Sequence, residues 1–153
     1  MTTYKPLLIL LFLVPLFSAC SKETEESKVK KVVAEVQHAA EEKKISRALD
    51  HISKSYGDPQ GNDYNDIKGI LAFYFFRHQR VSVFIPNVDV VVTGSAAQAV
   101  FQAVMNGRGT GGGILPEALG VYNFEVHLSK EDGTWKITSA GWKPAGEVMA
   151  PPQ

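Results

Sequence analysis

The chain has 153 residues, with 16 basic and 16 acidic side chains and a formal net charge of zero. A balanced charge argues against nucleic acid as a partner, because phosphate binding needs clustered Lys and Arg. The chain contains a single cysteine, so no disulfide forms within it and its core must be held by burial alone.

The N-terminal stretch has the layout of an export signal. Lys5 gives a short basic start, and the apolar run Leu7–Phe17 is too short to span a bilayer of about 30 Å as a helix. Two small residues follow, and then Cys20. We therefore expect residues 1–19 to be a signal peptide that is removed, and residues 20–28 to form a polar tether.

The segment Phe17-Ser18-Ala19-Cys20 resembles the lipobox of bacterial lipoproteins. The resemblance implies a diacylglyceryl thioether on Cys20, cleavage just before it, and acylation of its new amino group. Two or three lipid chains anchor a protein stably, whereas one gives marginal binding. Ser21 stands where lipoproteins of the inner membrane tend to have Asp, which favours the outer membrane, with the domain facing the periplasm. The alternative is an ordinary secretory signal followed by an unrelated cysteine.

Three helices are predicted in the next part of the chain. Apolar residues at helical spacing give one face over residues 29–43 and another over residues 45–52, before the breaker Gly57-Asp58-Pro59. A third helix starts after a cap at Asn62 or Asp63. Its aromatic bulk, which predicts burial on more than one side, comes from Phe73, Tyr74, Phe75 and Phe76.

From Val81 onward the apolar period switches to two, which is typical of strands. A first extended run is interrupted at Pro86-Asn87, and the predicted strands cover residues 81–92, 97–105, 121–128 and 135–142. A glycine-rich loop spans residues 106–113, and residues 144–153 form a loose Pro-rich tail. Helices followed by about four antiparallel strands predict an α+β fold, with the helices packed on one face of a bent sheet.

This order resembles the NTF2-like superfamily of cone-shaped α+β proteins, which includes SnoaL-like and ketosteroid-isomerase-like members. The resemblance rests on the aromatic helix that runs into Val81-Ser82-Val83-Phe84, and on the terminal hairpin Asp132–Ile137 leading to Trp142. The stretch from Ile52 to Gln79 also looks like uncharacterised bacterial lipoproteins of this fold. The resemblance implies one NTF2-like domain over residues 29–143, with a pocket between the concave face of the sheet and the helices.

Glu125 and His127 are the candidate catalytic residues. They lie two residues apart on one strand face, where Asn123 extends the row, and a carboxylate beside an imidazole suits proton transfer. The competing interpretation is that this row faces solvent, opposite a buried stripe. The strict alternation of polar and apolar residues over 121–128 favours that interpretation.

Four aromatic residues are candidates for lining an apolar ligand pocket, although the aromatic set as a whole is expected to be mostly core. They are Tyr74, Phe76, Trp135 and Trp142.

Other motifs have simpler explanations. The polar residues of 58–66 suggest a cation loop, but helix capping explains them, and no metal site is predicted. The stretch Gly107–Gly113 lacks the Gly-Lys-Ser/Thr of a phosphate loop, so we expect a plain loop. Asp50 and His51 point about 100° apart on a helix and do not cooperate, and His78 is expected near a helix end. No cofactor is predicted.

The sequence is informative about location and fold rather than activity. It favours a lipid-anchored envelope protein that is a non-catalytic module, binding a small apolar ligand or an envelope protein, with the membrane as partner through Cys20. The alternative is a small cofactor-free isomerase, dehydratase or hydrolase that uses a carboxylate or His in the cone. A homodimer formed by pairing of sheets, a habit of the superfamily, is a third possibility.

Overall fold

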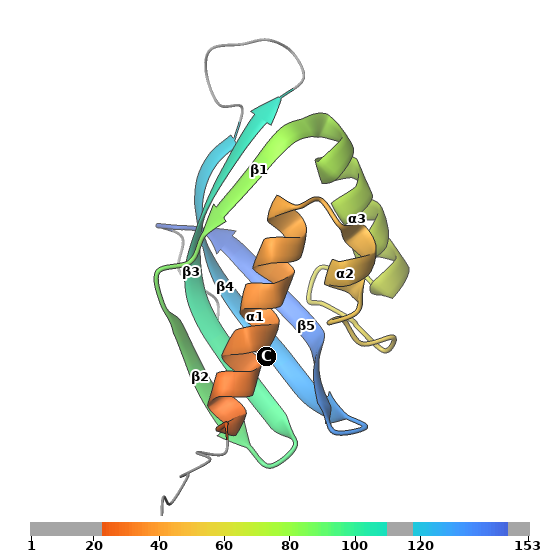
Figure 1. The fold of residues 1–153 in the computed structure, drawn as a ribbon, viewed down its shortest axis with the longest axis vertical. Coiled ribbons are helices and arrows are strands. Elements are labelled where there is room, and N and C mark those ends of the chain that lie inside the picture. The colour runs from red at the N-terminus through yellow and green to blue at the C-terminus, as the bar shows by residue number, and fades with distance from the viewer. Residues whose placement is uncertain (1–22, 110–117, 147–153) are drawn as a thin grey trace, which may run out of the picture.

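The computed structural model describes residues 23–109 and 118–146, so the predicted signal peptide, Cys20 and residues 147–153 of the tail lie outside the described residues. Three helices precede the strands, as the sequence predicts for an α+β protein, and there are five strands where about four were expected (Figure 1). The elements are α1 (Glu25–Glu41), α2 (Ile45–Leu49), α3 (Tyr64–Arg77), β1 (His78–Phe84), β2 (Val88–Thr93), β3 (Ala96–Gly109), β4 (Ala118–Glu131) and β5 (Thr134–Pro144).

The strands form one antiparallel sheet in the order β1-β3-β4-β5, with β2 also paired to β3. The run predicted as one strand over 81–92 becomes two strands, because Pro86 has no N–H to donate to a ladder. Pairing stops at Phe84 opposite Val104 and resumes at Val88 opposite Phe101. The curved sheet wraps around α1, which lies across its concave side (Figure 1).

The core lies between α1 and this concave face. Val29, Val32 and Val33 of α1 pack there against alternate residues of the strands. The other residues of the buried cluster are Leu49 of α2 and, from loops and strands, Ile52, Tyr56, Ala97, Ala99, Val126, Leu128, Trp135 and Ile137. Helix α1 starts at Glu25, capped by the Thr24 hydroxyl, and so occupies part of the stretch interpreted as a tether.

Local signals explain the helix ends. Lys43 has a φ of 57°, which separates α1 from α2. Asp63 caps α3 as predicted: its carboxylate accepts from the backbone of Asn65 and Asp66, while Asp66 accepts from the backbone N–H of Asp63. The chain then passes from Arg77 directly into β1 without a loop.

Two differences from the predicted elements concern α3 and β3. The expectation that α3 is buried on more than one side is wrong: Phe75 is its buried residue, whereas Phe73, Tyr74 and Phe76 are exposed. The reason is that α3 packs against α2 and β1 rather than between two layers. Of the loop predicted over 106–113, Asn106–Gly109 instead continue β3 as the partner of β1, and the rest lies outside the described residues.

Both edges of the sheet are partly covered. At β1, the side chains of Gln37 and Glu41 bond the carbonyl and N–H of Val83 at 2.7 and 3.0 Å. At β5, Ser53 N–H donates to the carbonyl of Ile137 at 2.8 Å. Covered edges are protected from pairing with other chains.

Candidate functional site

The outer face of the sheet, on the side away from α1, carries the predicted candidate pair. Residues of β4 alternate, so Val126 and Leu128 enter the core while Glu125 and His127 point outward. His127 Nε2 lies 3.1 Å from Glu125 Oε1, and Gln98 of β3 donates to the same oxygen at 2.7 Å. The residues therefore form a polar row on an open surface.

This geometry matches the solvent-facing interpretation of the Glu125–His127 pair. The His127 side chain is 51% exposed and Glu125 is 30% exposed. A catalytic acid–base pair gains strength where water is excluded, which an open sheet face does not provide. A structural row of hydrogen bonds across β3 and β4 accounts for the three side chains.

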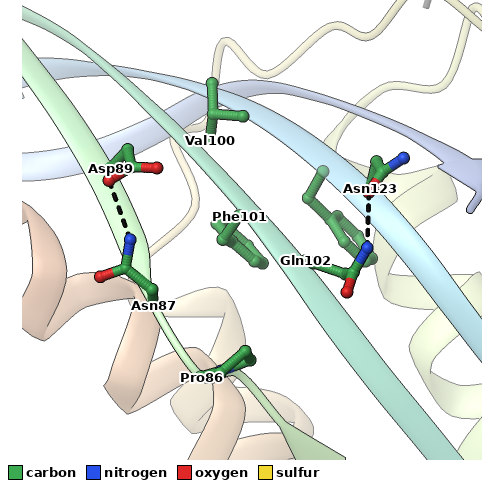
Figure 2. A pocket seen from close by; sticks show the side chains of 8 residues that line it. Pro86, Asn87, Asp89, Val100, Phe101, Gln102 and Asn123 are labelled. Carbon is green, nitrogen blue, oxygen red and sulfur yellow. Dashed lines mark hydrogen bonds between the residues drawn. The ribbon is translucent and has the colours of Figure 1, made fainter. Parts of the chain in front are cut away.

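A hollow of about 400 Å³ lies beside the break between β1 and β2 (Figure 2). The break leaves Gln102 and Ala103 of β3 without a strand partner on that side. The chain at Pro86 arches past this gap. The lining residues are Pro86, Asn87, Asp89, Val100, Phe101, Gln102, Asn123 and Phe124.

The polar groups of the hollow are already paired in two couples. Asn87 Nδ2 donates to Asp89 Oδ1 at 2.8 Å, and Gln102 Nε2 donates to Asn123 Oδ1 at 3.2 Å (Figure 2). The second couple leaves the Gln102 carbonyl oxygen and the Asn123 amide nitrogen outside the bond. Each of these groups is able to bond a ligand, the first as an acceptor and the second as a donor.

Aromatic side chains support the strands at this point. The rings of Phe101 and Phe124 stack with centroids 5.2 Å apart and planes 8° apart, and Trp142 lies 6.3 Å from Phe124. Stacked aromatic pairs of this kind add to the stability gained from burial, so these rings help to hold β3, β4 and β5 together beside the hollow.

The four aromatic residues predicted to line a pocket lie apart. Trp142 adjoins the hollow through Phe124, whereas Trp135 is buried and donates its indole N–H to Glu25 at 2.8 Å. Tyr74 stacks on the ring of His78, 6.1 Å away, and Phe76 points into solvent. The hollow residues Asn87, Asp89 and Gln102 were missed; Pro86-Asn87 inside a β-branched run marks the position of the first two, whereas no local signal marks Gln102.

The polar loop before α3 is a set of turns. The Asp58 carboxylate accepts from the N–H groups of Gln60 and Asn62, both at 2.9 Å, and from the Asn62 side chain at 2.8 Å. Its oxygens are used by the loop itself. Within residues 23–109 and 118–146, no group of three or more His, Cys, Asp or Glu side chains has the geometry to hold a metal ion.

Two more histidines have distinct surroundings. His51 is half-buried, and this burial lowers the pKa of its imidazole. His78 is 6% exposed, and its Nδ1 has no hydrogen-bond partner. An unpaired polar atom inside a protein is uncommon, so His78 is a notable group at the junction of α3 and β1.

None of the helices in the described parts is long and apolar enough to cross a bilayer.

Neither a family model nor a curated protein matches the sequence. Solved structures do resemble the fold. An NTF2-like superfamily protein from Salmonella enterica aligns with a TM-score of 0.68 and 11% identity, covering 81% of this chain and 93% of that one. A candidate dehydratase of the NTF2-like family from Streptomyces avermitilis gives 0.66 and 14%, covering 82% and 96%.

A longer protein, Bd1075 of Bdellovibrio bacteriovorus, aligns with a TM-score of 0.66 and 12% identity over 76% of this chain. The chain spans 40% of the length of that protein. Identities this low establish the fold alone. The cone-shaped NTF2-like architecture predicted from the sequence is therefore confirmed.

Proposed function

We propose that the protein is a lipid-anchored, non-catalytic binding module of the bacterial envelope. In this proposal it takes up a small ligand, with an apolar body and one or two polar groups, in the hollow beside Pro86. The observation that carries the proposal is the composition of the hollow. Val100 from the outer side and Phe101 and Phe124 from the core side give it apolar lining, and the Gln102–Asn123 couple gives it polar groups. Among the described residues, no histidine, cysteine or serine lines it.

The size of the hollow is consistent with a small ligand. Ligand sites typically measure about 300–1,000 Å³ and combine apolar walls with a few polar groups that fix orientation. The single carboxylate of the lining, on Asp89, is bonded by Asn87 at 2.8 Å. A ligand with one amide or hydroxyl group satisfies the Gln102–Asn123 couple without bringing a charge.

The anchor and the location rest on the N-terminal sequence. Leu7–Phe17 followed by Ser18-Ala19-Cys20 supports export and lipidation, and Ser21 supports the outer membrane. In the proposal, Cys20 holds the domain at the periplasmic surface of that membrane. A ligand of envelope origin, such as a fragment of a lipid or of a wall polymer, fits this location.

The test is a two-dimensional amide NMR screen of the domain against envelope metabolites and lipid fragments. We expect shifts at Gln102 and Asn123, and an affinity loss of about 2- to 10-fold for Asn123→Ala, because a hydrogen bond contributes about 0.5–1.5 kcal/mol. Gln98→Ala is the control, since Gln98 lies on the same face but outside the hollow. Shifts that leave the residues lining the hollow unchanged would contradict the proposal.

One observation favours a second candidate, a small cofactor-free isomerase or dehydratase. The imidazole of His78 is buried, and its Nδ1 has no hydrogen-bond partner among the described residues, which is uncommon for a buried polar atom and calls for an explanation. In that case His78, rather than Glu125 or His127, would take the proton. The test is deuterium exchange at carbon atoms of small ketones and hydroxy acids in D₂O. Exchange that persists in a folded His78→Asn variant would remove this candidate.

A further inference from the structure

The solvent side of α3 carries a line of residues that the described parts of the chain leave uncovered. Asp66, Gly69, Phe73 and Phe76 follow one another at intervals of three, four and three residues, and all four are exposed. Phe73 is 58% exposed and Phe76 is 88% exposed. The 3-4-3 interval is the spacing of a helix seam that packs against another helix.

This face differs from the scattered apolar residues of an ordinary surface. Two phenylalanines lie on one line, with Ala72 beside them. Single exposed apolar residues need no explanation, but a contiguous apolar strip on a helix is characteristic of an interaction surface. One side of α3 is already buried against the domain through Phe75. A helix that is apolar on its other side as well is typically covered there by a partner.

We propose that this strip pairs with the same strip of a second copy, with the two α3 helices antiparallel across a two-fold axis near Ala72. Charge is the first reason. Asp66 lies in the first turn of α3 and Arg77 in the last, on the same side of the helix. In an antiparallel pair, Asp66 of each copy approaches the partner's Arg77, so the surface is complementary to itself.

Shape is the second reason. Antiparallel pairing about this axis places Gly69 of one copy opposite the partner's Phe73. A Cβ at Gly69 would meet nothing within 4 Å, so the position is an open notch on the helix surface. The large ring and the notch interlock, as small and large residues do at facing positions of packed helices. Arg77, whose guanidinium lies 5.9 Å from the Phe73 ring, flanks the contact.

The pairing is independent of the proposed ligand site. The residues that line the hollow belong to β2, β3, β4 and the turn at Pro86-Asn87, whereas α3 packs against α2 and β1. One helix pair buries less than the roughly 800 Å² per partner of a standard interface. We therefore expect a weak dimer, for which chemical crosslinking is the suitable measurement.

The experiment uses the full chain, expressed in the envelope, with Ala72→Cys as the reporter. Cys20 is the single native cysteine, so the wild-type chain measures any background. Val91→Cys is the matched reporter for the opposite surface, because Val91 is exposed on the outer face of the sheet. After mild oxidation, we expect a disulfide-linked dimer for Ala72→Cys well above both the wild type and Val91→Cys.

A second substitution, added to the Ala72→Cys variant, then tests which surface forms the dimer. Phe76→Glu and Phe84→Glu are matched, since both replace an exposed phenylalanine, Phe84 being 61% exposed on the sheet. We expect Phe76→Glu to lower the crosslinked fraction about 10-fold, because it replaces an apolar contact of the pairing by a charge beside the partner's Asp66, and Phe84→Glu to leave it unchanged. Arg77→Glu should lower it as well, because it faces the partner's Asp66.

Circular dichroism melts confirm that each variant is folded. Two results would overturn the pairing. The first is crosslinking of Ala72→Cys no stronger than that of Val91→Cys. The second is loss of the dimer with Phe84→Glu but not with Phe76→Glu, which would assign it to the sheet.

Discussion

Trp135 Nε1 donates to Glu25 Oε2 at 2.8 Å, and this bond joins the first turn of α1 to the last strand. Lys130 Nζ donates to the same oxygen at 2.9 Å, and Lys28 Nζ donates to the other at 2.8 Å. These donors, with Lys28 contributing most, lower the pKa of the Glu25 carboxyl from 4.5 to about 2. Glu25 therefore fixes the start of the domain onto its final hairpin.

We predict that Glu25→Gln lowers the thermal stability of the protein at pH 7. A carboxylate whose pKa is lower in the folded state stabilises it above the unfolded value of 4.5, and that contribution is lost as pH falls towards 2. The difference in Tm between wild type and variant should therefore shrink from pH 5 to pH 2. Glu26→Gln, an exposed neighbour, is the control. A difference that does not change with pH would contradict the prediction.

Leu128 is 2% exposed in the centre of the core. Leu128→Ala should lower the free energy of unfolding by about 2–5 kcal/mol, because it removes buried methyl groups and leaves a cavity. Val91→Ala, on the outer face of the sheet, should cost less than about 1 kcal/mol. Urea denaturation of both variants checks the prediction, and equal losses would place Leu128 outside the core.

Gly69 lies in the middle of α3 with open space where a Cβ would stand. Gly69→Ala should raise the free energy of unfolding by about 0.5–1 kcal/mol, because glycine lowers helix stability by that amount relative to alanine. The midpoint of urea denaturation measures the change. A lower midpoint would mean that the position does not tolerate a methyl group.

Cys20→Ala tests the proposed anchor. We expect the native chain to carry added lipid mass and to sediment with membranes, and the variant to be recovered without added lipid in the soluble fraction. Intact mass spectrometry and fractionation give the result. Native protein that is soluble and unmodified would rule the anchor out and leave a freely diffusing periplasmic domain.

The sequence predicted the elements that repeat a strong local pattern. Valines at helical spacing located α1, and the alternation of Asn123, Glu125 and His127 with apolar neighbours correctly placed that row on the outer face. Asp63 was one of two caps suggested and is the one used. These features depend on neighbours in sequence, which is why a single chain reveals them.

The remaining features depend on contacts between distant segments. Aromatic residues 73–76 indicated burial, but only the packing partner of α3 decides which of them is covered. The hollow depends on a mismatch in pairing between Phe84–Val104 and Val88–Phe101. Asn87 and Gln102 come together across that gap, and no local signal marks both.

The bond between Glu25 and Trp135 has a geometric consequence for the proposed anchor. Four residue steps separate Cys20 from the capping residue Thr24, so the tether between them would span roughly 14 Å if fully extended. With so short a tether, the β4–β5 hairpin that bonds Glu25 would lie close to the lipid headgroups. Helix α1 rises about 25 Å over its 17 residues, and Lys43 beyond its far end bonds His78 at the end of α3. The protein would therefore stand upright, with the aromatic end of α3 displayed away from the bilayer.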